Sequence, residues 1–533
     1  MLFDRRHAHF PVPGWTWLVT AVGLATALGA QPRVDLRASP ESRADRVDPW
    51  LGSPVVVGPL GGYAAATAVD AAYHAGSDRF IVAWSAYSSD SGGSLSAWTN
   101  AQRVAPDGTA VGLPICVECD PSTESAGARV ACVEGANVFL VAMNPWLGGG
   151  PVTLATLDPL AGAYPVGITN VSLSVGSYDV GGGATKATTA LLVTAGNTVT
   201  ATLVECRGQR PEAGATVVVA RPGVTTRHIR VTGTAGTEGR YLSVWQQGNE
   251  LAYAVIDPQL RVLDQGCVDG VATPPTSQPW FDVAGDGSTW LIAYVVDRLG
   301  LHDIWAATVV WNASTGTADV GAPFPVAVEP ALGESDPSVT YTDGSFLIGY
   351  VANDRVVVPI EPFARRVCGP AATVAVRRTL LSALAGQPGG DRAVLGWESG
   401  GIRARVYRAD DGITRDLGGG CGGGEARALC AVRGNAQFHL RLRGAAALIP
   451  AAVAVGAPGP GAPCGPCRFV PDLGAALVVA GMTGSAGGAG LLVPLLDDPA
   501  VVGLTFAQQW LTLAGVGCAG SVAFSNALEV QIQ

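Results

Sequence analysis

The most recognisable chemical motif in the chain is the cysteine pair of Cys464-Gly465-Pro466-Cys467, which has the spacing used by thiol–disulfide oxidoreductases. That chemistry places the first cysteine at a helix N-terminus, where the helix dipole lowers the pKa of the thiol. Here a run of glycine and proline precedes the motif, and Pro471 follows four residues after Cys467 and blocks a long helix. The sequence therefore predicts a structural loop, with or without a disulfide, and no redox centre.

Cysteine pairing stays open at the level of the sequence. The chain has 11 cysteines, an odd number, so at least one cannot pair within the chain. The cysteines closest in sequence are Cys116 and Cys119, Cys421 and Cys430, and Cys464 and Cys467. Proximity alone does not establish which of them form disulfides.

Histidines offer no metal or catalytic constellation. Beyond the N-terminal segment the histidines are His74, His228, His302 and His439. They fall at different positions of different repeat units, so neither a metal triad nor a nucleophile–base pair can be argued from spacing. We therefore predict no catalytic residue, no metal site and no cofactor.

The remaining candidates are acidic, basic and aromatic residues on loops, which are the usual carriers of function on a rigid scaffold. They are Asp90, Asp120, Glu124, Trp146, Asp297, Arg298, His302, Asp303, Glu334, Asp336 and Glu398. An acidic rim with an aromatic residue suits a sugar or a cation. The alternative for each residue is an ordinary solvated polar surface.

A repeated strand positions these loops. Residues 78–84, a turn followed by an apolar run ending in Trp84, recur with variation through the chain. The recurring runs end at Met143, Ala195, Trp245, Tyr294, Tyr350 and Trp397. A period of about 50 residues built from strands indicates a β-propeller. We predict about seven blades, with six or eight open because the second and third units are degenerate.

The domain organisation follows from where the repeat begins and ends. The propeller is predicted over residues 52–416, a glycine-rich flexible linker over 417–424, and an all-β sandwich over 425–533. The last repeat unit lacks a fourth strand after Tyr407, and the isolated strand Val55-Val56-Val57 could fill that vacancy and close the ring.

The N-terminus has the pattern of an export signal. Arg5 and Arg6 precede an apolar core at 15–24 and small residues at 25–30, which predicts a signal peptide over 1–30 and a leader over 31–51. A retained membrane anchor is the rival interpretation. The net charge of −10 argues against nucleic acid and against anionic lipid. We predict a secreted or cell-surface protein with no membrane span after signal cleavage.

Two family resemblances accompany this interpretation. With its turn, apolar run and closing Trp or Tyr, 52–416 resembles the irregular β-propellers of exported bacterial proteins. Residues 425–533 resemble a C-terminal β-sandwich module of large secreted bacterial proteins. The matching stretches are Asn435-Ala436-Gln437-Phe438, the Cys467 strand leading to Pro471-Asp472, 503–508, and Phe524-Ser525-Asn526-Ala527-Leu528. The resemblance implies surface delivery or packing for this module, without assigned chemistry.

These observations favour a non-enzymatic binding or scaffold protein that acts through the loop face of the propeller. Its expected ligand is a protein or a carbohydrate outside the cytoplasm. The alternative is a propeller-type hydrolase or lyase acting on polysaccharide, because propellers host both kinds of function. A close carboxylate pair in a deep channel would favour the enzyme, whereas a wide shallow face would favour binding.

Overall fold

The computed structural model describes most of the chain beyond residue 53. The described residues are 54–58, 65–89, 95–119, 125–145, 150–171, 176–183, 187–207, 210–224, 226–232, 239–268, 280–285, 289–298, 301–328, 334–342, 345–352, 354–360, 372–375, 382–387, 392–398, 401–408, 414–429, 431, 438–472, 474, 476–483, 487–496, 498–513, 517–518 and 520–532. The predicted signal peptide and leader lie outside these residues. Within them, we find no helix with the length and apolarity needed to cross a membrane.

The first repeat unit is a four-stranded antiparallel sheet in the order β2-β3-β4-β5. Its strands are β2 (Ala65–His74), β3 (Arg79–Ser89), β4 (Leu95–Val104) and β5 (Ala110–Glu118). The apolar run of β3 is buried throughout from Phe80 to Trp84. Apolar residues on both faces of one strand mean that both faces of the sheet are covered, as in a propeller blade packed between two others.

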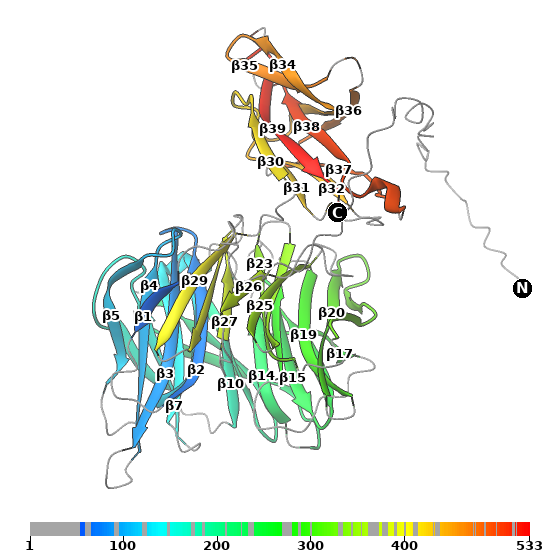
Figure 1. Ribbon diagram of the computed structural model, residues 1–533. Coiled ribbons are helices and arrows are strands. Elements are labelled where there is room, and N and C mark those ends of the chain that lie inside the picture. The colour runs from blue at the N-terminus through cyan, green and yellow to red at the C-terminus, as the bar shows by residue number, and fades with distance from the viewer. Residues whose placement is uncertain are drawn as a thin grey trace, which may run out of the picture. The chain divides into compact units, whose positions relative to one another are not determined.

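Five further sheets repeat this strand order along the chain (Figure 1). They are β6 (Ser125–Val133), β7 (Val138–Pro145), β8 (Val152–Leu157) and β9 (Gly167–Val171); β10 (Ser177–Gly182), β11 (Thr189–Ala195), β12 (Val199–Glu205) and β13 (Glu212–Ala220); β14 (Thr226–Thr232), β15 (Tyr241–Gln247), β16 (Glu250–Ile256) and β17 (Val262–Val268); β18 (Phe281–Gly285), β19 (Thr289–Arg298), β20 (Leu301–Asn312) and β21 (Thr317–Val320), with β22 (Phe324–Ala327) also on β20; and β23 (Ser335–Thr342), β24 (Ser345–Ala352), β25 (Asp354–Ile360) and β26 (Ala372–Ala375). A short 3-10 helix, η1 (Glu134–Ala136), follows β6.

The last sheet of the series is completed from the other end of the chain. β27 (Ser382–Gly386), β28 (Arg392–Glu398) and β29 (Ile402–Arg408) pair in order, and β1 (Val55–Gly58) pairs antiparallel with β29. Val55 lies opposite Ala404 and Val56 opposite Arg403. The expectation that the Val55–Val57 strand fills the vacancy after Tyr407 is confirmed.

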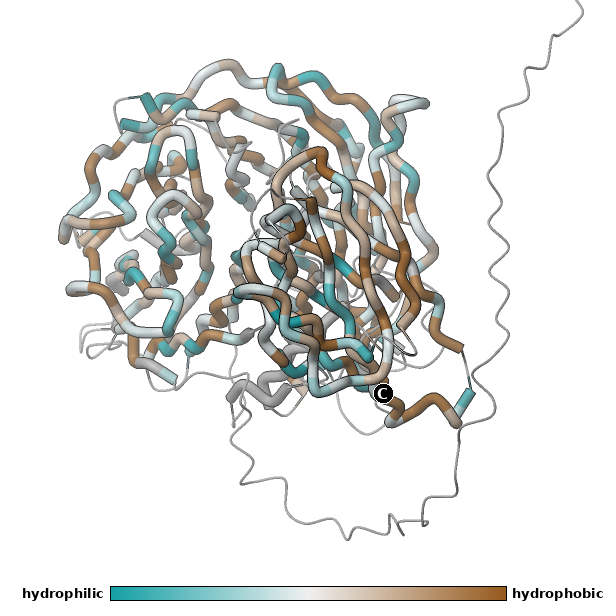
Figure 2. The backbone as a smooth tube through the Cα atoms, turned by 90° about the horizontal axis from the view of Figure 1, so that it is seen from above, coloured by the Kyte–Doolittle hydropathy of each residue, from teal (hydrophilic) through white to brown (hydrophobic). Residues whose placement is uncertain are grey.

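The sheets form a closed cycle. The innermost strand of each sheet contacts that of the next, from β2 through β6, β10, β14, β18, β23 and β27, and β27 returns to β2. Apolar residues concentrate in the strands, as the brown stretches of Figure 2 show. One core cluster joins Val57 of β1, Trp84 of β3 and Val406 of β29, so the first and last sheets share a hydrophobic interface. The predicted all-β propeller fold is correct.

The C-terminal residues form a β-sandwich, as predicted. One sheet has the order β30-β39-β38-β33-β36, the second β31-β32-β37, and β34-β35 is a hairpin. Their bounds are β30 (Thr414–Gly418), β31 (Glu425–Leu429), β32 (His439–Arg443), β33 (Pro450–Gly456), β34 (Pro458–Cys464), β35 (Cys467–Pro471), β36 (Leu477–Met482), β37 (Ala489–Leu492), β38 (Thr505–Thr512) and β39 (Ala523–Gln531), with the 3-10 helix η3 (Pro499–Val501) before β38. Leu440 of β32 and Phe438, which directly precedes β32, pack against Val453, Trp510 and Val530 of the other sheet.

The glycine-rich segment 417–424 differs from its prediction as a flexible linker. It belongs to the sandwich, because β30 pairs with β39 and the backbone N–H groups of Cys421 and Gly423 both donate to the Phe524 carbonyl oxygen. A Cβ on Gly423 would collide with the backbone around Phe524. These glycines therefore permit close packing of two chain segments, a role that a glycine run does not distinguish from flexibility in sequence.

Among the described residues, the sandwich disulfides join cysteines that are distant in sequence, and the propeller disulfide joins two that are close in sequence. Cys464 bonds to Cys518 and Cys467 to Cys421, while Cys116 bonds to Cys119. The two cysteines of Cys464-Gly465-Pro466-Cys467 thus lie on either side of the β34–β35 turn and pair with other partners. This agrees with the predicted structural loop.

Candidate functional site in the central channel

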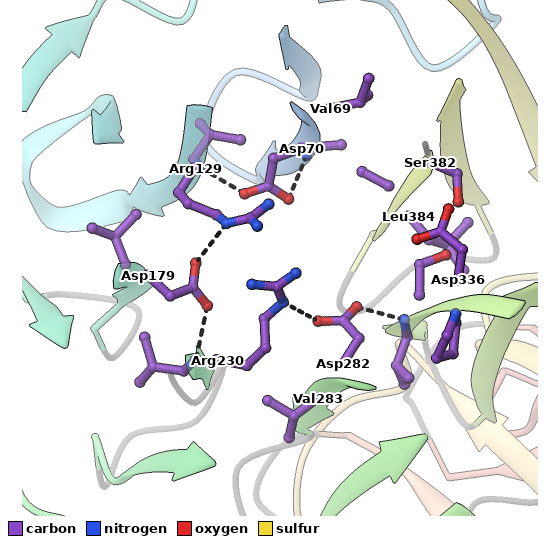
Figure 3. A pocket seen from close by; sticks show the side chains of 18 residues that line it. Val69, Asp70, Arg129, Asp179, Arg230, Asp282, Val283, Asp336, Ser382 and Leu384 are labelled. Atoms are coloured by element: carbon purple, nitrogen blue, oxygen red, sulfur yellow. Dashed lines mark hydrogen bonds and ion pairs between the residues drawn. The ribbon is translucent and has the colours of Figure 1, made fainter. Parts of the chain in front are cut away.

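Each innermost strand lines the central channel with at least one polar residue at the same level (Figure 3). We call these residues the polar ring; they are Asp70, Arg129, Asp179, Arg230, Asp282, Asp336 and Ser382. Acidic and basic residues alternate over the first five. Since the flanking residues on the same strands are mostly apolar and packed between sheets, the ring residue is the point where each strand meets the channel.

β-Bulges occur beside several ring residues, whereas Asp179 and Asp282 lie on strands whose pairing has no register shift. The register of β2 shifts between Ala66 and Ala68, ahead of Asp70, and that of β14 shifts at His228, ahead of Arg230. In β23 the shift includes Asp336 itself, which has a φ of 52°. A bulge adds one residue and re-aims the following side chain, so it can turn a polar side chain out of an interface and into the channel.

Three ring carboxylates each bind the backbone of the next innermost strand, which links neighbouring sheets. The bonds run to Asp70 Oδ2 from Val130 N at 2.7 Å, to Asp179 Oδ2 from Val231 N at 2.8 Å, and to Asp282 Oδ2 from Val339 N at 2.8 Å. In chain order, these bonds join the first sheet to the second, the third to the fourth, and the fifth to the sixth. A charged acceptor on a backbone N–H makes a stronger bond than a neutral one.

The two arginines link the intervening pairs of sheets. Arg129 Nε lies 3.8 Å from Asp179 Oδ1, and Arg230 Nε lies 3.4 Å from Asp282 Oδ1. Only 18% of the Arg129 side chain and 13% of the Arg230 side chain are exposed. Together with the carboxylate–backbone bonds, these ion pairs connect the first six sheets in sequence around the channel.

Side-chain hydrogen bonds continue the links around the rest of the cycle. The backbone N–H of Gly386 donates to Thr340 Oγ1, joining the last two sheets. Gln387 Nε2 donates to the Tyr73 hydroxyl at 2.9 Å, joining the last sheet to the first. The cycle is thus held by polar contacts at the channel as well as by β1 at its rim.

Burial shifts the pKa values of the ring carboxyls upward. Desolvation raises the pKa of Asp179 to about 7 and that of Asp282 to about 6, against the attraction of Arg230 in both cases. It also raises the pKa of Asp70, against the attraction of Arg129. A raised carboxyl pKa in a cavity is found at catalytic sites but also in structural ion-pair networks.

The channel widens beyond the ring, toward the ends of the innermost strands. The cavity at the ring has a volume of ≈ 130 Å³, and the adjoining chamber has ≈ 300 Å³. We call the larger cavity the wide chamber. Its walls include Tyr73, Tyr341, Thr232 and Thr340 together with many small residues. The wall glycine Gly182 has no room for a Cβ, which would collide with the Cys132 carbonyl.

One part of this wall carries side chains of metal-ligating type. His74, Cys132 and Glu134 each offer a ligand atom, and these atoms lie within 4.8 Å of one another. Cys132 and Glu134 line the wide chamber. The sequence did not predict this group, because the three residues come from two different repeat units.

The structure places the predicted loop residues in several locations. Asp90, Asp120, Glu124 and Trp146 lie outside the described residues, and so does the side chain of Arg298, at the end of β19. Asp336 belongs to the polar ring. Glu398 ends β28, and burial raises the pKa of its carboxyl.

The fifth and sixth sheets bring four predicted residues together. Asp297 pairs with His302 across the β19–β20 hairpin, and the His302 ring packs edge-on against Trp280 at 4.3 Å. The Glu334 N–H donates to the His302 carbonyl at 2.8 Å. Glu334 and Asp303 are buried, at 0% and 5% exposure, which argues against the solvated rim that their sequence positions suggest.

Of the residues in the polar ring, Asp336 was predicted from the sequence, although a pattern in the sequence marks several of the others. The first five ring residues are each a single charged residue within a short, mostly apolar stretch, as in Val69-Asp70-Ala71 and Tyr178-Asp179-Val180. Each stretch precedes the recurring apolar run by a similar distance. Aligning the innermost strands of the repeats, rather than the loops, would have brought these residues into one column.

Comparisons with known proteins found distant structural similarity. No protein-family model matches the chain, and no curated protein matches it. The β-propeller domain of Cps50 (Swd1) from Myceliophteria thermophila is similar with a TM-score of 0.42 at 10% identity, over 67% of this chain and 98% of that one. A chain of the mitotic checkpoint complex has a TM-score of 0.40 at 12% identity, over 71% and 99%. A prolyl endopeptidase chain has a TM-score of 0.37 at 13% identity, over 72% and 54%.

Proposed function

We propose that this chain is an exported, non-enzymatic binding protein whose propeller presents the wide chamber to a carbohydrate end group. The observation that carries the proposal is the chamber itself, ≈ 300 Å³ of space walled by rigid innermost strands. That volume is at the lower end of the range typical of ligand sites. The predicted protein ligand is the other outcome that the experiment below distinguishes.

The lining of the wide chamber fits a sugar better than a charged ligand. Tyr73 and Tyr341 supply aromatic surface, and Thr232 and Thr340 supply hydroxyl groups. An aromatic face packs on the C–H side of a sugar ring, while hydroxyls and backbone groups exchange hydrogen bonds with its hydroxyls. Glu134 is the acidic group on the wall, and backbone N–H groups already bind its carboxylate.

The polar ring supports binding over hydrolysis. Asp70, Asp179 and Asp282 each accept a backbone N–H, and Arg129 and Arg230 pair with two of them. A glycosidase needs two carboxyl groups that face a substrate, one as acid and one as base or nucleophile. In this ring the carboxylates alternate with arginines and hold neighbouring sheets together.

The alternative, a hydrolase or lyase acting on polysaccharide, has one observation in its favour. Burial raises the pKa of Asp179 to about 7 and that of Asp282 to about 6, values suited to a general acid at neutral pH. If this function holds, Asp282→Asn abolishes turnover while the chain still binds its ligand.

The test is binding of the purified chain, residues 31–533, to a glycan array, followed by calorimetry on the best glycan. Tyr341→Ala is expected to weaken binding by about tenfold or more, because it removes the aromatic face from the chamber. Tyr164→Ala is the matched control, since Tyr164 is 75% exposed and does not line the chamber.

Three outcomes contradict the proposal. Absence of glycan binding, or equal affinity of Tyr341→Ala and the parent chain, excludes the wide chamber as a carbohydrate site. Release of new reducing ends from a polysaccharide identifies the enzyme instead. Specific binding of a protein with no glycan binding moves the ligand class to protein.

Export is the second part of the proposal, and it is supported by the N-terminal pattern and by disulfides in both folded parts. Expression in a bacterial host with a secretion pathway should yield mature protein outside the cytoplasm, with its N-terminus at residue 28 or 31. Mature protein that keeps Met1 and sediments with membranes would favour the retained anchor.

A further inference from the structure

A compact group of three ligand-type side chains joins the first two sheets beside the wide chamber. His74 is the last residue of β2, Cys132 lies near the end of β6, and Glu134 begins η1. His74 Nε2 lies 3.6 Å from Glu134 Oε2, and Cys132 Sγ lies 3.3 Å from Glu134 Oε1. Two repeat units therefore bring a nitrogen, a sulfur and an oxygen ligand to one point.

The imidazole of His74 provides an independent indication of a missing partner. His74 is 1% exposed, and its Nε2 has no hydrogen-bond partner among the described residues. The distance of 3.6 Å to Glu134 Oε2 is too long for a hydrogen bond. A buried polar nitrogen without a partner is costly, so a ligand at Nε2 would be stabilising.

Ser77 contacts the other ring nitrogen of His74, and metal binding at Nε2 would change this contact. Both Ser77 N and Ser77 Oγ lie 3.0 Å from His74 Nδ1. With a proton on Nε2, Nδ1 accepts the Ser77 N–H. With Nε2 bound to a metal, Nδ1 carries the proton instead, so the bond from the Ser77 N–H is lost and Ser77 Oγ becomes the acceptor, in place of the carboxylate, carbonyl or water that metal-bound histidines usually have.

The spacing of the three ligand atoms fits tetrahedral coordination. Zinc bonds of about 2.0 Å to nitrogen or oxygen and 2.3 Å to sulfur place tetrahedral ligand atoms roughly 3.3–3.5 Å apart. The separations of 3.6 Å and 3.3 Å are close to these values, but they end at different oxygens of Glu134, Oε2 for His74 and Oε1 for Cys132, so zinc binding requires the carboxylate to rotate or to bind through both oxygens. The Glu134 carboxylate is also oriented, because the N–H groups of Ala75 and Gly76 donate to its two oxygens.

We propose that His74, Cys132 and Glu134 bind one Zn²⁺ ion that ties β2 to β6, with a fourth coordination position open to the wide chamber. A nitrogen, a thiolate and a carboxylate form a donor set that zinc accepts, and three protein ligands with one open position is the arrangement of an accessible zinc site. Cys132 and Glu134 line the chamber, so water or an oxygen of a bound ligand can take the fourth position. Binding releases the thiol proton of Cys132 to solvent.

The alternative is a hydrogen-bonded contact without metal, in which the Cys132 thiol donates to Glu134 Oε1 at 3.3 Å. This contact needs neither Nε2 of His74 nor a fourth ligand. The two interpretations predict different metal stoichiometries and different effects of replacing His74, so the test below distinguishes them.

The test uses the full purified chain, stripped with a chelator and titrated with Zn²⁺ against a chromophoric competitor. One ion per chain is expected, and substitution with Co²⁺ is expected to give a near-ultraviolet thiolate-to-cobalt charge-transfer band. Cys132→Ser and His74→Gln should each lower zinc affinity by about 100-fold or more, since loss of even an outer-shell partner costs 10–100-fold.

Cys267→Ser is the matched control, because it removes a thiol of β17 that is not part of this group. It should leave both affinity and the cobalt spectrum unchanged. Absence of stoichiometric zinc binding by the parent chain, absence of the charge-transfer band, or unchanged affinity of Cys132→Ser would overturn the site. The cobalt spectrum of the parent chain decides the matter even if a variant fails to fold. Glycan binding can fail without affecting this result, because the metal is titrated without a ligand.

Discussion

The propeller and the C-terminal sandwich hold themselves together in different ways. In the propeller, β1 pairs with β29 across most of the domain's sequence, and the described disulfide spans only 3 residues. In the sandwich, two disulfides span 46 and 54 residues. A closed ring obtains its long-range connections from topology, whereas a small two-sheet domain has less surface to bury and relies on covalent links.

The two regions also differ in how far their sheets are covered by neighbouring parts of the chain. Successive propeller sheets pack on both faces, with charged groups of the innermost strands paired around the channel. In the sandwich, β36 pairs only with β33 among the described strands, and Leu477, Val478 and Met482 on it are 60%, 57% and 63% exposed. An apolar strand edge is a place where a second chain can pair.

The largest expected effect comes from removing the strand that closes the propeller. Deletion of residues 54–58 removes the buried Val57 and the pairing of β1 with β29. Burial of a valine is worth roughly 1.5–3 kcal/mol and each net hydrogen bond about 1 kcal/mol, so several kcal/mol should be lost. The measurement is the thermal midpoint of the propeller transition.

A deletion of residues 31–50 is the control for the strand deletion, and it should leave that midpoint unchanged. The sandwich transition should stay in place in both truncated chains. Equal propeller midpoints for the two deletions would show that closure at the rim contributes little beside the polar contacts at the channel.

Next in size is the loss of one sandwich disulfide. Replacing Cys421 and Cys467 by serine opens a loop with a sequence separation of 46 residues. Chain entropy assigns about 4 kcal/mol to such a loop, and only the sandwich transition should shift. The same replacement at Cys116 and Cys119 should cost the propeller about 2 kcal/mol. A larger loss in the propeller would reverse the comparison.

A smaller effect, specific to the propeller, is its dependence on pH. The folded pKa of about 7 for Asp179 and about 6 for Asp282 lies above the ordinary unfolded value of about 3.9. The folded chain therefore binds more protons than the unfolded chain between these values, so propeller stability falls as pH rises from about 4 to 7. Each carboxyl contributes a slope of up to about 1.4 kcal/mol per pH unit.

Denaturant titrations at several pH values measure this slope. Asp179→Asn should flatten it, because asparagine does not titrate, and the remaining slope should end near the folded pKa of Asp282, about 6. Identical slopes for Asp179→Asn and the parent chain would mean that the buried Asp179 carboxyl does not govern the pH response.

The smallest effect on stability is expected at the sandwich edge. Val478→Lys places a charge on an exposed position of β36 and should change the free energy of unfolding by no more than about 0.5 kcal/mol. Self-association at high concentration, measured by analytical ultracentrifugation, should decrease. Val218→Lys on the outer propeller strand β13, where Val218 is 46% exposed, is the control and should not change it. Equal effects of both substitutions would remove the distinction between the two edges.

The sequence by itself determined the all-β class, the repeat and the missing strand of the last unit. Runs such as Phe80 to Trp84 are apolar on both faces, and this local pattern already requires a sheet covered on both sides. The vacancy after Tyr407 could be matched to the valines at 55–57 because the count of strands per unit is itself a sequence property. The strands of each repeat unit are recognised from residues close together in the chain, and counting them shows where a strand is missing.

Only the tertiary structure decided what the polar residues and glycines do. Whether the glycines at 417–424 give flexibility or close packing depends on the Phe524 backbone about a hundred residues away. The pairing of Arg230 with Asp282, and the meeting of His74 with Cys132 and Glu134, likewise depends on how far the chain turns between one innermost strand and the next. Periodicity reports which strand a residue occupies, but contact between repeats is a property of packing, and packing is set by the closed ring as a whole.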